Sequence, residues 1–314
     1  QRENFKGFAC QFEGEEHQLE EEEHSHADLR AGDCDFRIYR LALACTGEYA
    51  SFHGGTVPLV MQAMVVAMAR VNGVFEKDLG LTTVLVPNND TLIFLNRNTD
   101  PYNNGNGGAM LGQNQATVDA RIGNSNYDIG HVFSTGGGGI ASRAGNVCFN
   151  SEKAGGVTGQ PSPINDPFTI DFVSHEMGHQ LGGTHTQNNF CQRTNFSAME
   201  PGSGSTIMGY AGICFPNVQQ NSDDYFHAIN LQQIGNYTTQ QTGNTCPDIV
   251  STNNNPPTVS AGANYTIPVS TPFELTAVAN DDDEDVLTYC WEQMDNESGT
   301  MPPRPNSSEG PMFR

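Results

Sequence analysis

Three of the chain's nine histidines lie within the eleven residues HEMGHQLGGTH, from His175 to His185. His175 and His179 are four positions apart, so on a helix both imidazoles lie on one side and can reach a single metal ion. Glu176 would project beside that ion, where a general base is needed rather than a ligand. Gly182 can adopt a positive φ, which lets the chain leave the helix sharply. His185 then brings a third ring nitrogen to the same place.

Three neutral imidazoles with an open fourth position describe a catalytic zinc site, whereas structural zinc sites use four protein ligands. A zinc-activated water with Glu176 as general base would hydrolyse a peptide bond, because zinc acidifies its water and polarises the carbonyl. The alternative is a helix with incidental histidines, but we expect roughly one chance match of the whole pattern in several thousand such chains. The third histidine also argues against thermolysin-like sites, which use a distant glutamate.

The motif requires a helix, and the surrounding Pro, Asp and Gly residues predict one from about Asp166 or Pro167 to the Gly182–Gly183 pair. The chain before it predicts a strand, a long helix and further strands, which indicate an α/β layer with a crossover connection. The other expected helices are 57–79 and 223–234, the expected strands are 34–49, 81–87, 91–95 and 127–134, and long Asn- and Gly-rich loops are expected at 96–108 and 134–139.

The histidine motif is followed by a Gly-bounded turn, SGSTIMGYAG, whose Met208 comes 23 residues after His185. HExxHxxGxxH followed by such a methionine turn resembles the metzincin clan of zinc endopeptidases. The stretch GGGGIASRAGNVC before the helix, together with cysteines flanking the turn, most resembles the adamalysin/reprolysin family within that clan. The resemblance covers roughly residues 34–249.

The resemblance implies an upper subdomain with a twisted, mostly parallel sheet and one antiparallel edge strand, and an irregular lower subdomain. Met208 would lie beneath the zinc site, and residues 206–215 would wall the pocket for the side chain after the cut bond. The edge strand, Ile140 to Ser142, would hold the substrate extended by β-augmentation, with Gly139, Ile140 and Ala141 as the substrate-binding residues. The implied disulfides are Cys148 with Cys246 and Cys191 with Cys214.

Two positions depart from the adamalysin pattern. Thr186 follows the third histidine where adamalysins usually carry Asp, and is more like pappalysins or matrixins. Tyr210, two residues after Met208, resembles the tyrosine of astacins and serralysins, which is an additional zinc ligand or a hydrogen-bond donor to the transition state. A tyrosine packed in the methionine turn is the alternative for Tyr210.

The composition limits the partners and the compartment. The 36 Asp+Glu against 14 Lys+Arg give a formal charge of −22, which argues against nucleic acid or anionic membrane surfaces. The longest apolar run, 57–69, is short for a bilayer and is interrupted by Gln62, so no membrane insertion is expected. Eight cysteines without a CxxC pair favour disulfides in an oxidising compartment. We therefore expect a secreted monomer that acts on proteins or peptides.

Four zones differ in composition: an acidic segment 1–33, a catalytic domain 34–249, a linker 250–257 and the beginning of a cadherin-like or PKD-like β-sandwich, 258–314. In the last zone Asp281, Asp283 and Asp285 are candidate calcium ligands, with a solvated acidic turn as the alternative. Cys10 is expected to form a disulfide with Cys34 or Cys45, or else to inhibit by occupying the open zinc position. His17, His24 and His26 are candidates for weak metal binding. The disulfide partner of Cys290 is left open.

The sequence thus predicts a secreted zinc endopeptidase. One alternative is a latent zymogen in which residues 1–33 still block the cleft. The other is a catalytically silent secreted binding protein on the same fold, although Glu176 speaks against it, because loss of that residue is the simplest way to silence such a site.

Overall fold

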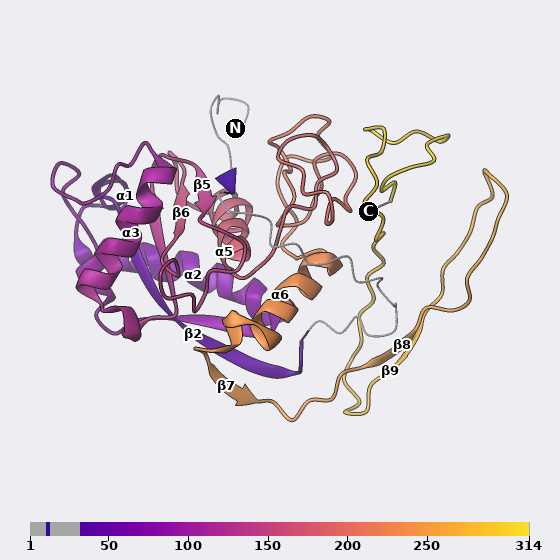
Figure 1. Cartoon of the computed structure of the whole chain (residues 1–314), viewed down its shortest axis with the longest axis horizontal. Helices are drawn as coiled ribbons and strands as arrows, with labels where there is room; N and C mark the ends of the chain where they lie inside the picture. Colours follow the sequence, from indigo (N-terminus) through magenta and orange to yellow (C-terminus); the bar gives the residue numbers. More distant parts are fainter. Residues whose placement is uncertain (1–10, 13–31, 314) are drawn as a thin grey trace.

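A seven-stranded mixed sheet organises the computed structural model, which describes residues 11–12 and 32–313 (Figure 1). The strand order is β1-β5-β6-β4-β2-β3, and β7 also pairs with β2. Strands β2, β3, β4 and β6 are parallel, while β5 is antiparallel to β6 and β7 is antiparallel to β2. The mostly parallel α/β fold is therefore confirmed. The bounds are β1 (Gln11–Phe12), β2 (Asp35–Cys45), β3 (Leu81–Leu85), β4 (Ile129–Ser134), β5 (Gly139–Ala141), β6 (Gly156–Gly159) and β7 (Asp248–Ser251).

Strand β2 is buried on both faces, as expected for a parallel strand with helices on either side. Its Leu41 and Leu43 belong to the core shared with α2 (Val57–Leu79) and the active-site helix. Its Ala42 and Ala44 belong to a second core with α3 (Gly107–Arg121). The sheet is thus the middle of three layers, and the helix that carries the histidine motif lies on the α2 side of it.

Helix α2 is the crossover connection between the parallel strands β2 and β3. The 57–79 prediction is confirmed, and Gly80 ends the helix in the left-handed conformation at φ 62°. By length and composition alone α2 could cross a membrane, and 33% of its most apolar window is buried. Val60, Met64 and Val71 lie fully in the core, so packing against the sheet accounts for its apolar inner face.

Two predicted strands were wrong in part or in whole. The strand expected over 34–49 ends at Cys45, because Thr46 caps the short helix α1 (Gly47–Phe52) by accepting from the Tyr49 N–H. Of the strand expected at 91–95, Thr91 and Leu92 instead belong to a 3-10 turn, η2 (Asn89–Leu92), and Ile93 pairs with Cys45 in an isolated parallel bridge. The Asn89 side chain accepts from the Leu43 N–H at 2.8 Å and donates to the Leu43 carbonyl at 2.9 Å, which replaces the backbone pairing of a strand.

Sequence patterning does not indicate α3, which follows the Asn- and Gly-rich loop directly. Asn106 is its N-cap, since its side-chain oxygen accepts from the Ala109 N–H at 3.0 Å. The late helix, α6 (Ala228–Gln240), starts five residues after the expected Asp223. Asp223 and Tyr225 pair instead with the methionine turn through the Asp223 N–H and the Tyr225 carbonyl.

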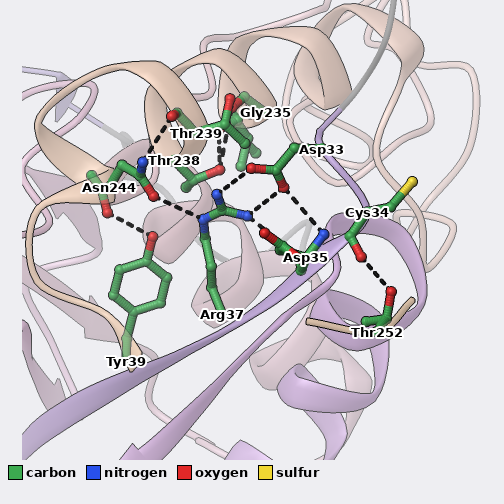
Figure 2. A network of polar contacts seen from close by, with 12 residues as sticks. Asp33, Cys34, Asp35, Arg37, Tyr39, Gly235, Thr238, Thr239, Asn244 and Thr252 are labelled. Carbon is green, nitrogen blue, oxygen red and sulfur yellow. Dashed lines mark hydrogen bonds and ion pairs between the residues drawn. The ribbon is translucent and has the colours of Figure 1, made fainter. Parts of the chain in front are cut away.

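The two ends of this sheet-containing unit are joined by a polar network around the buried Arg37 (Figure 2). Its guanidinium binds the Asp33 carboxylate at 2.6 Å and donates to the Asn244 side-chain oxygen at 3.2 Å. Nearby, the Tyr39 hydroxyl donates to the Gly243 carbonyl at 2.8 Å, and Thr252 donates to the Cys34 carbonyl. Residues 33–39 and 243–252 therefore lie side by side.

Beyond β7, the described residues form one small antiparallel sheet of β8 (Thr258–Ser260) and β9 (Val278–Asn280). The structure has no other strand within residues 252–313, which is fewer than the predicted β-sandwich requires. The last stretch of the chain lies beside the loops of residues 186–227 (Figure 1). There the Asn188 side chain donates to the Glu297 carbonyl at 3.0 Å. Glu292 accepts from the Ala228 N–H at 2.6 Å, at the start of α6.

Candidate metal centre

The active-site helix runs without a break from Asp166 to Gln180, as the sequence predicts. It consists of α4 (Asp166–Phe168), a π-helical segment η4 (Thr169–Ser174) and α5 (His175–Gln180). π-helical turns are rare and concentrate at functional sites. Gly182 then takes φ 105°, and this left-handed turn directs the chain toward His185. A positive φ is the conformation that the sequence predicts for Gly182.

The structure brings His175, His179 and His185 together, all of them buried. One nitrogen from each ring lies within 4.8 Å of the others, and the His179 and His185 Nε2 atoms are 3.0 Å apart. The three Nδ1 atoms face backbone carbonyls: Ile207 at 2.7 Å, Gly183 at 2.8 Å and Gln192 at 3.0 Å. Because each Nδ1–H is donated to a carbonyl, each Nε2 is left with its lone pair directed into the site.

Burial lowers the pKa of two of these imidazoles, those of His179 and His185. It lowers the pKa of His179 to about 4. Burial also holds the pKa of His185 well below its usual value, and the neighbouring His179 and His175 lower it further. Metal ligation requires the unprotonated ring. Three buried, convergent imidazole nitrogens are the donor set that suits zinc, so the residues present fit this ion.

Glu176 is fully buried beside the histidines, and β5 runs directly against it. A Cβ added to Gly139 would lie 2.1 Å from the Glu176 Oε1, so this glycine is required for the close approach of strand and carboxylate. Gly139, Ile140 and Ala141 form β5, antiparallel to β6 as expected of the edge strand. On its other side β5 pairs in parallel with β1, in the register Gln11 to Ile140 and Phe12 to Ala141.

Met208 lies under the helix, fully buried in the main core. A Cβ on Gly178 would be 2.6 Å from the Met208 sulfur, so helix and methionine turn are packed in direct contact. Tyr210 is also buried, with its ring centroid 4.7 Å from that of His185. Its hydroxyl is hydrogen-bonded to the Gln192 side chain. The structure therefore places both residues against the histidine cluster.

Both disulfides implied by the resemblance are confirmed: Cys148 with Cys246, and Cys191 with Cys214. Cys34, Cys45 and Cys290 are free among the described residues. Burial raises the pKa of the Cys45 thiol to about 12. The candidates Cys10, His17, His24 and His26 lie outside the described residues, as does nearly all of the acidic segment.

The candidate calcium ligands are not drawn into one cluster. Within the described residues, the three histidines form the sole group of three or more such side chains with converging ligand atoms. The Asp283 carboxylate instead accepts from the Asn255 backbone and side chain. Asp281 accepts from the N–H groups of Asp283 and Asp285, at 2.9 and 3.2 Å. This pattern is that of a hydrogen-bonded acidic turn.

Sequence reasoning missed the residues that support the ligands. Gln180, within the motif, connects α5 to β4 through His131, whose Nδ1 is 2.7 Å from the Gln180 Oε1. Gln192 takes a left-handed φ of 50° and contacts both His185 and Tyr210. Glu200 accepts from hydroxyl and amide donors in the loop after His185 and at the start of the methionine turn. Only Glu200 had a signal in the sequence, an acid within the hydroxyl-rich stretch MEPGSGST.

Comparison with known families matches residues 36–238 to the metallopeptidase family M12B, reprolysin-like. No curated protein matches the chain. Among solved structures, one described as "Structure of a chaperone-substrate complex" is similar at 14% identity and a TM-score of 0.39, covering 65% of this chain and 35% of that one. The chain thus spans about a third of that structure's length. The family match extends over more than half of the 314 residues and includes every ligand of the metal centre, so the chain belongs to the reprolysin-like M12B metallopeptidases.

Proposed function

We propose that this protein is a zinc-dependent endopeptidase that hydrolyses peptide bonds in extracellular proteins. The observation that carries the proposal is the convergence of three buried imidazole nitrogens within 4.8 Å, next to a buried carboxylate. His175, His179 and His185 would hold the ion, and Glu176 would act on the water. The family match and the two disulfides support a metallopeptidase of an oxidising compartment.

Zinc held by these nitrogens would polarise the scissile carbonyl and make the attacking water more acidic. Glu176 would take the proton from that water as general base and then deliver it to the leaving amine. Glu176 is fully buried next to His175 in the sequence, at the position where such a base is needed. Tyr210, beside His185, is placed to donate a hydrogen bond to the developing oxyanion after its hydroxyl leaves Gln192.

Substrate would lie along β5, adding a strand to the sheet beside Glu176. The close approach of Gly139 to the Glu176 carboxylate supports this, since a peptide paired with β5 passes the proposed base. Residues 206–215, which carry Met208 and Tyr210, would form the wall on the opposite side.

A latent form is the second candidate, and one observation favours it. Strand β1 pairs in parallel with β5, on the edge that a substrate strand would need. An N-terminal segment paired at this edge would compete with substrate for the same position. Residues 1–33 would then act as an internal inhibitor of the same active site.

The test of the proposed function is the cleavage of a broad quenched-peptide library by the parent and by Glu176→Gln at equal zinc content. We expect the parent to cleave and the variant to lose several orders of magnitude in kcat/KM, because removing the base leaves the ligands intact. Equal, measurable cleavage by both proteins would sink the proposed role of Glu176.

If the parent is inert with zinc bound, trimming the chain to Asp33 separates the two alternatives. A latent enzyme gains activity on trimming, and this gain is absent in the trimmed Glu176→Gln protein. A catalytically silent binding protein stays inert after trimming, although it keeps its zinc.

The C-terminal zone has a separate proposal: residues 258–314 are the beginning of a β-sandwich module that accompanies the catalytic domain. The antiparallel pair β8–β9 supports it. Calcium titration of the intact protein, read by isothermal calorimetry, would test whether Asp281, Asp283 and Asp285 bind the ion. Absence of binding at millimolar calcium would leave them a solvated turn.

A further inference from the structure

Glu200 is a buried carboxylate at the junction of the third histidine and the methionine turn. Only 3% of the residue is exposed. Its backbone continues the loop after His185, since the Glu200 N–H donates to the Thr186 carbonyl at 2.8 Å and the Asn188 N–H donates to the Glu200 carbonyl at 2.9 Å. The side chain therefore starts from a fixed position next to the third ligand.

Both carboxylate oxygens of Glu200 are saturated with donors from two segments. Oε1 accepts from the hydroxyls of Thr186 and Thr206, each at 2.5 Å. Oε2 accepts from the N–H groups of Ser205 and Thr206, at 2.7 and 3.0 Å, and from the Ser205 hydroxyl at 3.2 Å. Thr186 is the residue after His185, and Thr206 is two residues before Met208. One carboxylate thus ties the ligand loop to the methionine turn.

A carboxylate group suits this set, because it offers two oxygens that can each accept from several donors. A glutamine has one oxygen, so its NH₂ group would face either two backbone N–H groups, which cannot accept, or the two threonine hydroxyls, which would lose their shared acceptor. Leaving buried donors unpaired costs about 1–3 kcal/mol each, and the two segments would separate to relieve it.

We infer that Glu200 is a positioning residue of the metal centre, which fixes His185 relative to His175 and His179. Glu200 is connected to His185 through the next residue, Thr186, whose hydroxyl donates to the Glu200 carboxylate. The Thr186 N–H also donates to the Met208 carbonyl at 3.3 Å. The His175 Nδ1 meets the Ile207 carbonyl in the same turn. A shift of the turn against the loop therefore moves two ligands in different directions. The inference rests on the proposed zinc site.

The experiment compares four proteins: the parent, Glu200→Gln, Thr186→Val and Thr186→Ser. For each it measures the zinc affinity, by competition with a chelating dye, and the visible absorption spectrum of the cobalt-substituted protein. We expect Glu200→Gln to weaken zinc binding 10- to 100-fold, the usual effect of losing an outer-shell contact, and to change the cobalt spectrum, which reports ligand geometry. Thr186→Val should weaken binding in the same direction, and Thr186→Ser, which keeps the hydroxyl, should restore the parent affinity and spectrum.

Two results would overturn the inference. One is a parent-like zinc affinity and cobalt spectrum in Glu200→Gln, even with a lower melting temperature, since Glu200 would then only stabilise the fold. The other is equal zinc binding by Thr186→Val and Thr186→Ser, which decides the matter if Glu200→Gln does not fold. Failure of the parent itself to bind zinc would instead overturn the proposed metal site, and with it this inference.

Discussion

At the scale of single residues, two glycines allow the backbone to come close to Glu176 and Met208. Gly139 faces Glu176, and Gly178 faces Met208, with a hypothetical Cβ at 2.1 and 2.6 Å from the nearest atom. Both contacts leave less room than any side chain needs. A methyl group at either position must therefore displace the functional residue opposite it.

Gly139→Ala should lower kcat/KM by about 100-fold or more, because an ångström of misplacement of a catalytic group has that effect. Zinc content should stay at the parent level, since the added methyl meets Glu176 and not a ligand. The measurement is peptide cleavage together with metal analysis.

Gly112→Ala is the matched control for that change. Gly112 lies within α3, and a Cβ there meets nothing within 4 Å. Its activity should equal the parent's, and its unfolding free energy should rise by about 0.5–1 kcal/mol, as for Gly to Ala in a helix. If Gly139→Ala cleaves as fast as Gly112→Ala, β5 does not confine the carboxylate.

At the scale of elements, the parts that the sequence predicts are those with strong local signals. The helix of residues 57–79 and the active-site helix have clear breakers at their ends, and the histidine spacing required the second to be helical. The strand predicted at 91–95 is reduced to a single bridge at Ile93. Its sequence pattern is local, whereas the contact that replaces the strand joins Asn89 to Leu43, which is 46 residues away. Glu200 and Gln192 act through tertiary contacts, which spacing in the sequence does not reveal.

Helix α5 is tied to the sheet through His131, and the burial of this ring makes the stability of the fold dependent on pH. Burial lowers the pKa of His131 to about 4, partly opposed by its hydrogen bond with Gln180. The folded protein therefore prefers the neutral ring, while the unfolded chain binds a proton near pH 6.5. The stabilisation is complete above pH 6.5 and is lost as the pH falls toward 4, up to about 3 kcal/mol.

His131→Asn should remove this pH dependence, since Asn keeps a donor near the Nδ1 position and does not titrate. We expect its unfolding free energy to fall less than the parent's between pH 7 and 4.5. Urea unfolding of both proteins measures this free energy. A chelator is present so that the three histidines of the motif are free of metal in both proteins and contribute equally. Parallel pH profiles for the two proteins would show that His131 is not the titrating group.

At the scale of the whole molecule, the two disulfides constrain different parts of the chain. Cys148–Cys246 closes a loop of 98 residues, joining the segment after β5 to the end of the domain near η5 (Thr242–Asn244). Cys191–Cys214 closes only 23 residues and joins the two loops beside the metal site, around Gln192 and after Tyr210. The first constrains the fold as a whole, and the second constrains the site.

Chain entropy gives about 4.7 kcal/mol for the longer loop and about 3.4 kcal/mol for the shorter one. Replacing Cys148 and Cys246 by Ala should therefore lower the unfolding free energy more than replacing Cys191 and Cys214. The shorter pair should have the larger effect on kcat/KM, because Gln192 contacts both His185 and Tyr210. Denaturant unfolding and peptide cleavage of the two double variants measure both quantities. If the Cys148/Cys246 variant were the one that lost activity at unchanged stability, this division of tasks would be wrong.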